Sequence, residues 1–219
     1  MAISSCRGDN GTVAENLDIY DANLTHLGVM ERTRAHLEGQ WHRAFHCWVV
    51  SDDGVLFQQR AGGVGTNPGL LDVSAAGHLT AGERSGSREI TEELGIEFAE
   101  EDLRFLGERV EVADVAGGHR NREYQSVHML RNDVPLSGYR PDPVEVSALF
   151  WLPIPDGYRL FGGTTDRLTL SGHAFGPTWR PHSREVTRDA FVPRLQRYYV
   201  TALIMAERLL AGQEPLAIS

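Results

Sequence analysis

The sequence predicts an α/β fold, a sandwich built around a mixed β-sheet. Short segments rich in Val, Ile, Phe and Trp, separated by Gly, Asp and Asn, are typical of strands and turns. Two other segments have the apolar spacing of helices, one in the middle of the chain and one near its end. No internal repeat or low-complexity linker divides the chain. We therefore expect a single domain over residues 16–219, after a disordered leader at 1–15.

The expected strands lie on both sides of the mid-chain helix. Those before the helix are 17–21 and 27–29, 41–50 and 55–60, and 71–74. The turn at Asp52-Asp53-Gly54 should join the second pair in antiparallel fashion. Those after the helix are 103–112, 122–130 and 150–152.

The last third of the sequence predicts an irregular insertion followed by a helix. Gly and Pro are frequent between about 155 and 186, which indicates either a lid or an ordered excursion. The terminal helix is expected at about 188–211, with Thr187 or Asp189 as its N-cap and Gly212 at its end. Its apolar stripe consists of Leu195, Tyr199, Ala202, Ala206 and Leu209.

Charge and cysteine content limit the class of protein. The chain has 219 residues and a formal net charge of -9, which argues against binding to nucleic-acid polymers but not against a single nucleotide. Cys6 and Cys47 are too few for a disulfide framework, so a reducing cytoplasm is expected. No apolar run is long enough for a signal peptide or a membrane span. We expect a soluble, cytoplasmic protein.

Three carboxylates share one face of the predicted mid-chain helix. Glu89, Glu92 and Glu93 stand at i, i+3 and i+4, while Ile90 and Leu94 form a neighbouring apolar face. Like charges at this spacing destabilise a helix unless a cation lies between them. Mg²⁺ or Mn²⁺, which prefer oxygen ligands, would remove that cost. The alternative is a solvated acidic face without a metal.

The residues around these carboxylates match a known motif. Gly77 and Glu83 are separated by five residues, and residues 88–96 read REITEELGI. The stretch resembles the Nudix box, in which Gly, five residues, Glu and seven residues precede this second half. Here only four residues, 84–87, separate Glu83 from Arg88.

Other residues resemble the Nudix subgroup related to isopentenyl-diphosphate isomerases. They are His36, Trp41 to His46, Gln58-Gln59-Arg60 and Ser74 to His78. The resemblance covers roughly residues 17–155 and implies the Nudix fold, an α/β/α sandwich around a mixed sheet. It also implies a pyrophosphohydrolase that cleaves a diphosphate linked to another group.

The resemblance assigns roles to the residues of the box. Glu89, Glu92 and Glu93 would hold Mg²⁺ or Mn²⁺ and act in catalysis. The structural brace of the box would consist of Gly77, Glu83, Arg88 and Gly95. In the family the general base comes from outside the box, and Glu123 and Glu145 are both candidates, although either could be a plain surface carboxylate.

Substrate recognition is less specified by the sequence. Arg43 and Arg60 could hold phosphate oxygens, and His78 is a further candidate for substrate binding. Trp48, or an aromatic residue of the insertion, could stack on a base or sugar. The substrate class stays open among nucleoside diphosphate sugars, dinucleotides, thiamine diphosphate and prenyl diphosphates. The exposed face of the terminal helix could serve a homodimer.

Two alternatives to a hydrolase follow from the same residues. In the isomerases a cysteine takes part in proton transfer, and its place here is taken by Ala76, although His36, His42 and His78 are counterparts of the isomerase metal ligands. The other alternative is a diphosphate-binding module with weak or no hydrolysis. The short segment between Glu83 and Arg88 favours this reading, because small misplacements can impair catalysis strongly.

Overall fold

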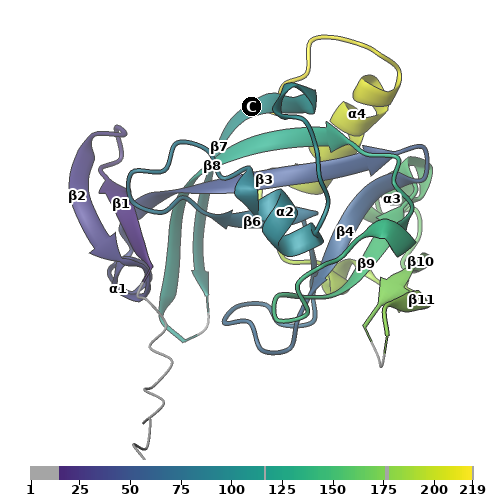
Figure 1. Cartoon of the computed structure of the whole chain (residues 1–219), viewed down its shortest axis with the longest axis horizontal. Coiled ribbons are helices and arrows are strands. Elements are labelled where there is room, and N and C mark those ends of the chain that lie inside the picture. Colours follow the sequence, from purple (N-terminus) through teal and green to yellow (C-terminus); the bar gives the residue numbers. More distant parts are fainter. Residues whose placement is uncertain (1–14, 116, 176–177, 219) are drawn as a thin grey trace, which may run out of the picture.

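A computed structural model describes residues 15–115, 117–175 and 178–218. Within these residues eleven strands form one sheet, with helices on both of its faces (Figure 1). The strands are β1 (Asn16–Tyr20), β2 (His26–Glu31), β3 (Trp41–Ser51), β4 (Gly54–Arg60), β5 (Leu71–Asp72), β6 (Ala75–His78), β7 (Leu103–Val115), β8 (His119–Arg131), β9 (Val146–Leu152), β10 (Leu168–Ala174) and β11 (Arg180–Val186). The α-helices are α1 (Arg32–Glu38), α2 (Arg88–Leu94), α3 (Ile154–Phe161) and α4 (Tyr198–Leu210).

The central strand of the sheet is β3. It runs parallel to β8, with His42 opposite Glu123 and Val50 opposite Arg131. It is antiparallel to β6 and, at its end, to β4. The predicted mixed sheet is therefore confirmed. The parallel pairing with β8 brings together residues that lie about eighty positions apart in the sequence.

Successive side chains of β3 alternate between two hydrophobic cores. Phe45, Cys47 and Val49 pack into the core that contains Ile90 and Leu94 of α2. On the other face, Trp48 and Val50 pack with α3 and α4. Because side chains in a strand point alternately to its two faces, β3 is buried on both sides and separates two helical layers. This arrangement confirms the predicted α/β/α sandwich.

Local sequence accounts for the buried face of α2 and for its C-terminal end. Ile90 and Leu94 are fully buried against the sheet. The helix ends at Gly95, whose φ of 61° lies in the left-handed region that glycine adopts at low cost. A Cβ at this position would lie 2.1 Å from the Arg140 carbonyl oxygen. Any other residue at 95 would therefore push apart α2 and the segment that precedes β9.

The strands expected from the sequence are present, but the insertion expected at 155–186 is not irregular. It contains α3, β10 and β11, and β10 extends the sheet by pairing with β9. Leu168 and Leu170 are buried between exposed residues, the alternation of a half-buried strand. Gly172, one of the glycines that suggested a loop, instead permits close strand pairing, since a Cβ there would lie 2.0 Å from the Leu149 carbonyl oxygen.

The terminal helix is shorter than the sequence predicted. A 3₁₀ turn at Arg188–Ala190 comes first, and α4 begins only at Tyr198. Gln196 and Arg197 both have positive φ, 59° and 55°, so the chain cannot be helical there. Leu195, expected in the apolar stripe, is instead 58% exposed. The end is as predicted within one residue, because Gly212 follows the last turn with a φ of 65°.

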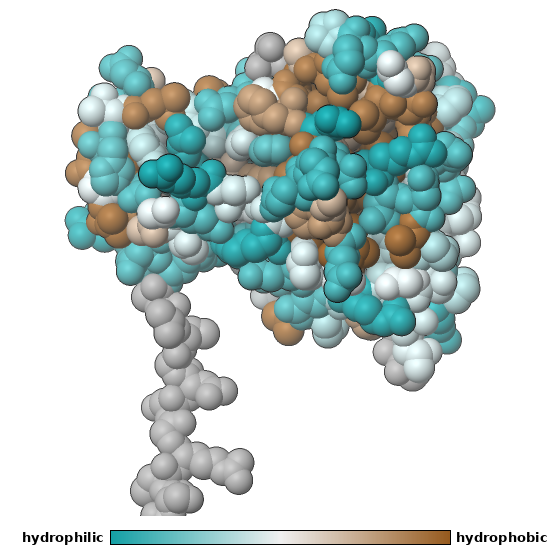
Figure 2. Space-filling view, turned by 45° about the horizontal axis from the view of Figure 1, so that its top comes forward, coloured by the Kyte–Doolittle hydropathy of each residue, from teal (hydrophilic) through white to brown (hydrophobic). Residues whose placement is uncertain are grey.

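Polar residues cover most of the face shown in Figure 2, with apolar residues gathered near its top. Exposed apolar side chains include Phe105, Val110 and Val112 of β7 and Ile204 of α4. None of the described helices is both long and apolar enough to cross a membrane. The predicted leader lies outside the described residues except for Glu15, which forms an ion pair of 2.5 Å with Arg32.

Candidate active site

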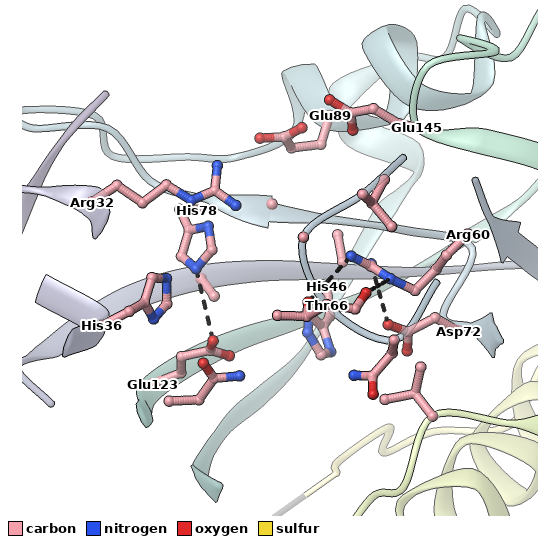
Figure 3. Close-up of a pocket in the computed structure, with 18 of the residues that line it drawn as sticks. Arg32, His36, His46, Arg60, Thr66, Asp72, His78, Glu89, Glu123 and Glu145 are labelled. Atoms are coloured by element: carbon pink, nitrogen blue, oxygen red, sulfur yellow. Dashed lines mark hydrogen bonds and ion pairs between the residues drawn. The ribbon is translucent and has the colours of Figure 1, made fainter. Parts of the chain in front are cut away.

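A polar cavity of about 1010 Å³ lies beside the β3–β6 pair and the end of α2. Figure 3 shows Glu89 and Glu145 on one side of it, His36, His78 and Glu123 on a second, and Arg60 and Asp72 on a third. The segment before α4 completes the lining with Arg194. The described lining residues include no Phe, Tyr or Trp. The cavity is therefore a charged site, and segments far apart in the chain contribute its lining residues.

Two glutamates of α2 are buried where the helix meets the cavity. Glu93 is 4% exposed, and its Oε2 accepts hydrogen bonds from the Ala76 backbone nitrogen at 2.8 Å and from Gln58 Nε2 at 3.1 Å. Glu89, one helical turn earlier, is 7% exposed. Both carboxylates line the cavity together with exposed Glu145. Three acidic groups thus face one small volume.

The electrostatics of these carboxylates favour a cation. Burial, opposed by Arg88 and assisted by Glu92 and Glu145, raises the pKa of Glu89 to about 7. Burial also raises the pKa of Glu93 well above its ordinary value, although the Ala76 hydrogen bond opposes the shift. Carboxyl groups held this way are costly to ionise. A hard divalent cation with oxygen ligands offsets that cost, so Glu89 and Glu93 fit Mg²⁺ or Mn²⁺.

Glu92 has a different environment from its two neighbours. Its side chain is 57% exposed and accepts a hydrogen bond of 2.5 Å from Arg88 Nη1. The Arg88 guanidinium also lies 2.9 Å from Glu89 and donates through Nε to Glu83 at 2.8 Å. Glu83 in turn accepts from the Thr80 backbone nitrogen at 2.9 Å. Arg88 therefore links the loop after β6 to the carboxylates of α2.

Gly77 is required by the position of Glu89. A Cβ built at residue 77 would lie 2.0 Å from Glu89 Oε1 and 2.1 Å from Cδ. Such contacts are far inside van der Waals distance, so any side chain at 77 would displace the carboxylate. The glycine lets α2 place Glu89 directly against β6.

A second group of ligands lies on the opposite side of the cavity. His36, His42 and His78 offer ring nitrogens that all lie within 4.8 Å of one another. Glu123 Oε1 is 3.7 Å from His78 Nε2 and 3.9 Å from His42 Nε2. Within this group, the buried ring nitrogens that have no hydrogen-bond partner among the described residues are His36 Nδ1 and Nε2, His42 Nε2 and both of His78.

Two of these histidines, His36 and His42, are held in their neutral form. Burial lowers the pKa of His36 to about 3 and that of His42 to about 4, and the neighbouring histidines add to both effects. Burial by itself would raise the pKa of Glu123, but the adjacent His78, with lesser effects of His42 and of a hydrogen bond from Gln125, holds it well below its ordinary value. Neutral imidazoles beside an ionised carboxylate are suited to bind a transition metal.

Other residues considered from the sequence occupy different places. Arg60 lines the cavity, whereas Arg43 lies outside it and faces Glu108 at 3.8 Å. Trp48 is fully buried and donates to Tyr198 Oη, so it cannot stack on a substrate. Trp179, from the predicted insertion, donates to the Leu136 carbonyl and likewise does not line the cavity. The expected aromatic platform is therefore absent from the described lining.

Sequence reasoning missed three groups that line this cavity. Gln58 follows from the alternation of β4, because it lies two residues before Arg60 and shares its face. Asp72 ends the two-residue strand β5 and is 3% exposed. Arg194 belongs to no recognisable motif, and only the folded chain brings it to the cavity.

Comparisons with known proteins show which family the chain resembles. The NUDIX domain profile matches residues 40–167. An uncharacterised Nudix hydrolase of Clostridium acetobutylicum is 32% identical over 197 residues, which cover 86% of this chain and 95% of that protein. An isopentenyl-diphosphate Delta-isomerase of Cereibacter sphaeroides is 32% identical over 133 residues, 58% of this chain and 72% of the isomerase.

A solved structure supports the fold. The crystal structure of DR0079 from Deinococcus radiodurans has a TM-score of 0.53 and 23% identity, covering 68% of this chain and 90% of that one. The domain match includes α2 and β8, which carry Glu89, Glu93 and Glu123 of the cavity lining. From this match, and from a relative aligned over nearly its whole length, we conclude that the chain belongs to the Nudix hydrolase family.

Proposed function

We propose that this Nudix-type pyrophosphohydrolase cleaves the diphosphate linkage of a small organic diphosphate with the help of Mg²⁺ or Mn²⁺. The observation that carries the proposal is the pair Glu89 and Glu93, two carboxylates buried side by side on α2 at the edge of a charged cavity. Glu92, exposed next to them, completes the proposed ligand set. A cytoplasmic location and a homodimer stay predictions from the sequence.

The residues around this pair have distinct proposed tasks. Bound Mg²⁺ or Mn²⁺ would supply positive charge for the diphosphate oxygens and a water of lowered pKa. The Ala76 backbone and Gln58 orient Glu93 by hydrogen bonds to one oxygen, which leaves the other free to face a ligand. Arg60 and His78 line the cavity and would bind phosphate oxygens.

Of the two candidate bases, Glu145 is the better supported. It lies close enough to Glu89 and Glu93 to raise the pKa of both. Glu123 lies beside His42 and His78 and accepts from Gln125 at 2.6 Å. Because the pKa of Glu123 is held well below its ordinary value, it is a poor acceptor for the proton of an attacking water.

An isomerase is the second candidate, and the histidine group is the observation that favours it. His36, His42, His78 and Glu123 form a ligand set suited to a transition metal. The acid–base chemistry is less well supplied, because Ala76 has no proton to donate at the place where the isomerases use a cysteine. We therefore rank isomerisation below hydrolysis.

A panel of organic diphosphates with Mg²⁺ or Mn²⁺ tests the proposal. It should include a nucleoside diphosphate sugar, a dinucleotide, thiamine diphosphate and isopentenyl diphosphate, with products separated so that isomerisation is detected as well. Glu93→Gln should lower kcat by about a hundredfold or more, as expected when a group at the reacting centre is lost. Glu101→Gln, an exposed glutamate of the 3₁₀ turn before β7, is the matched control.

Each result of this experiment has a clear meaning. Hydrolysis that Glu93→Gln removes and Glu101→Gln preserves supports the proposal. Metal binding without turnover of any substrate would favour the diphosphate-binding module instead. Full activity of Glu93→Gln would contradict the assignment of the metal site.

A further inference from the structure

Asp72 is a buried carboxylate that faces two arginines at different distances. Arg194 Nη2 donates to both of its oxygens, at 2.7 and 2.9 Å. Arg60 Nη1 lies 3.7 Å away, which is beyond a hydrogen bond. The remaining contact of Asp72 is local, from the Val73 backbone nitrogen at 2.9 Å. The carboxylate is therefore bound to Arg194 and only loosely paired with Arg60.

The segment before α4 is held in place by contacts that do not involve Arg194. The Val192 backbone nitrogen donates to the Leu71 carbonyl at 2.8 Å, beside the start of β5. Tyr199 Oη donates to the Val192 carbonyl at 2.6 Å. Phe191 forms a bridge to Leu71 and is 2% exposed in the core. This anchoring brings the side chain of Arg194 under the cavity, next to Asp72.

The buried charges around Arg194 balance without Arg60. Arg194 Nη1 donates to Glu111 at 3.1 Å, and Arg109 Nη1 lies 2.6 Å from the same carboxylate. Arg109 and Arg194 carry two positive charges, and Asp72 and Glu111 carry two negative ones. Arg60 is therefore not needed to neutralise this buried group, and its pairing with Asp72 stays loose.

Some N–H groups of Arg60 make no hydrogen bond to the described residues and can donate to a ligand. Its Nε donates to the Thr66 carbonyl at 2.9 Å, which fixes the direction of the guanidinium (Figure 3). Nη2 makes one long contact of 3.5 Å with Thr66 Oγ1, and Nη1 makes no hydrogen bond among the described residues. The side chain is 21% exposed and lines the cavity. Such a guanidinium is suited to bind a phosphate oxygen.

We propose that Arg194 is a positioning residue, which engages Asp72 and so keeps Arg60 available for an anionic group of the substrate. Without Arg194, Asp72 would be a buried carboxylate with no hydrogen-bonded counter-ion, a costly state that a small movement of Arg60 toward it would relieve. Arg60 would then be drawn into the protein and away from the cavity. The inference rests on the proposed function for the identity of the anion. It adds a site residue outside the region that the NUDIX profile matches.

Binding of inorganic diphosphate in the presence of Mg²⁺, measured by calorimetry, tests this role without requiring turnover. Arg194→Met should raise the Kd by about tenfold or more, as expected for loss of a hydrogen bond to a charged group. Arg60→Met should raise it equally, and Arg60→Met with Arg194→Met should be no weaker than Arg60→Met alone. Arg208→Met, at the far end of α4 where Arg208 contacts the Pro215 carbonyl, is the matched control.

Removing the charge of Asp72 in the Arg194→Met variant distinguishes a positioning role of Arg194 from a purely structural one. Asp72→Asn combined with Arg194→Met removes the carboxylate that would capture Arg60, so the Kd should return to near the wild-type value. Additive losses in the Arg60 and Arg194 double variant, or a Kd of Arg194→Met equal to that of wild type, would overturn the proposal. If Arg194→Met alone does not fold, the double variant Asp72→Asn with Arg194→Met tests the proposal instead. Weak diphosphate binding by that folded double variant would contradict the proposed role of Arg194.

The two proposals can fail independently. Loss of all hydrolytic activity in the substrate panel, with the pattern of Kd values intact, would remove the proposed function and leave the role of Arg194 standing. If the protein hydrolyses a substrate of the panel but Arg194→Met binds inorganic diphosphate with the Kd of wild type, the proposed function stands and the role of Arg194 is contradicted.

Discussion

Arg88 Nε donates to Glu83 Oε1 over 2.8 Å, although only four residues separate the two. The intervening segment passes close to the sheet at Gly86, where a Cβ would lie 2.4 Å from Phe45 Cβ. Glycine at this point allows the chain to turn directly from the loop into α2. The short connection is therefore compatible with contact between the loop and the helix, which weakens the main argument for a module without catalysis.

The first prediction concerns this contact. Glu83→Gln removes the charge that orients Arg88 and weakens the acceptor for the Thr80 backbone nitrogen. Because partners of metal ligands tune their orientation, we expect kcat/KM to fall about 10- to 100-fold. Steady-state kinetics on the best substrate measures the effect. Glu38→Gln, which breaks the exposed Arg34–Glu38 pair of α1, should leave kcat/KM unchanged.

The second prediction uses the close approach of Gly77 to Glu89. Gly77→Ala places a methyl group where Glu89 Oε1 now lies, 2.0 Å from the new carbon. The carboxylate must move by about 1 Å or more, and a displacement of that size can cost about a hundredfold in rate. Turnover and Mg²⁺ affinity should both fall. Gly62→Ala, where no atom lies within 4 Å, is the control, and equal activity of the two variants would contradict the prediction.

Local patterns predicted much of the fold around the box. The spacing of Ile90 and Leu94 gives the buried face of α2, and Gly95 gives its end, because both depend on neighbours within one or two turns. The same local reasoning misjudged Gly172, since glycine marks a loop in one setting and close strand packing in another. It also placed the start of the last helix about ten residues too early, because the positive φ of Gln196 and Arg197 has no signature in their side chains.

The site depends on pairings that no local pattern contains. Glu123 reaches His42 because β8 pairs in parallel with β3, and Arg194 reaches Asp72 because the segment before α4 binds beside β5. Trp48 suggested a stacking platform, yet it is interior because both faces of β3 are covered by helices. Residue identity indicated which groups carry chemistry. Only the folded chain determines which of them meet.

The third prediction is a dependence of stability on pH in metal-free protein. The pKa of Glu89 is about 7 in the folded protein, whereas a glutamate in the unfolded chain has the ordinary value of 4.5, so the folded state binds the proton more tightly. The unfolded chain therefore ionises first as pH rises above 4.5, and stability declines until about pH 7. The loss has an upper limit of about 3 kcal/mol, since one pKa unit corresponds to about 1.4 kcal/mol.

Glu89→Gln tests the sign of this linkage. The variant cannot ionise at this position, so in chelator at pH 8 it should melt at a higher temperature than wild type. At pH 4.5 and below, where Glu89 is protonated in both states, the two melting temperatures should converge. Addition of Mg²⁺ at pH 8 should stabilise wild type more than the variant. A lower melting temperature of Glu89→Gln at pH 8 in chelator would show that burial does not control this carboxyl group.

The last prediction addresses the histidine group on the far side of the cavity. His36 and His42 are buried and His78 is partly buried. The low pKa values of His36 and His42 keep those two imidazoles neutral, so a metal ion need not compete with protons there near pH 7. We expect Zn²⁺ to bind there with Glu123 and independently of the α2 carboxylates. His42→Gln should raise the Kd for Zn²⁺ about tenfold or more, because loss of a residue that only hydrogen-bonds to a metal ligand already weakens metal binding by about tenfold. His182→Gln on exposed β11 should not change it. Calorimetry in the Glu93→Gln background isolates this site, and equal Zn²⁺ affinity of the His42 and His182 variants would assign the binding elsewhere.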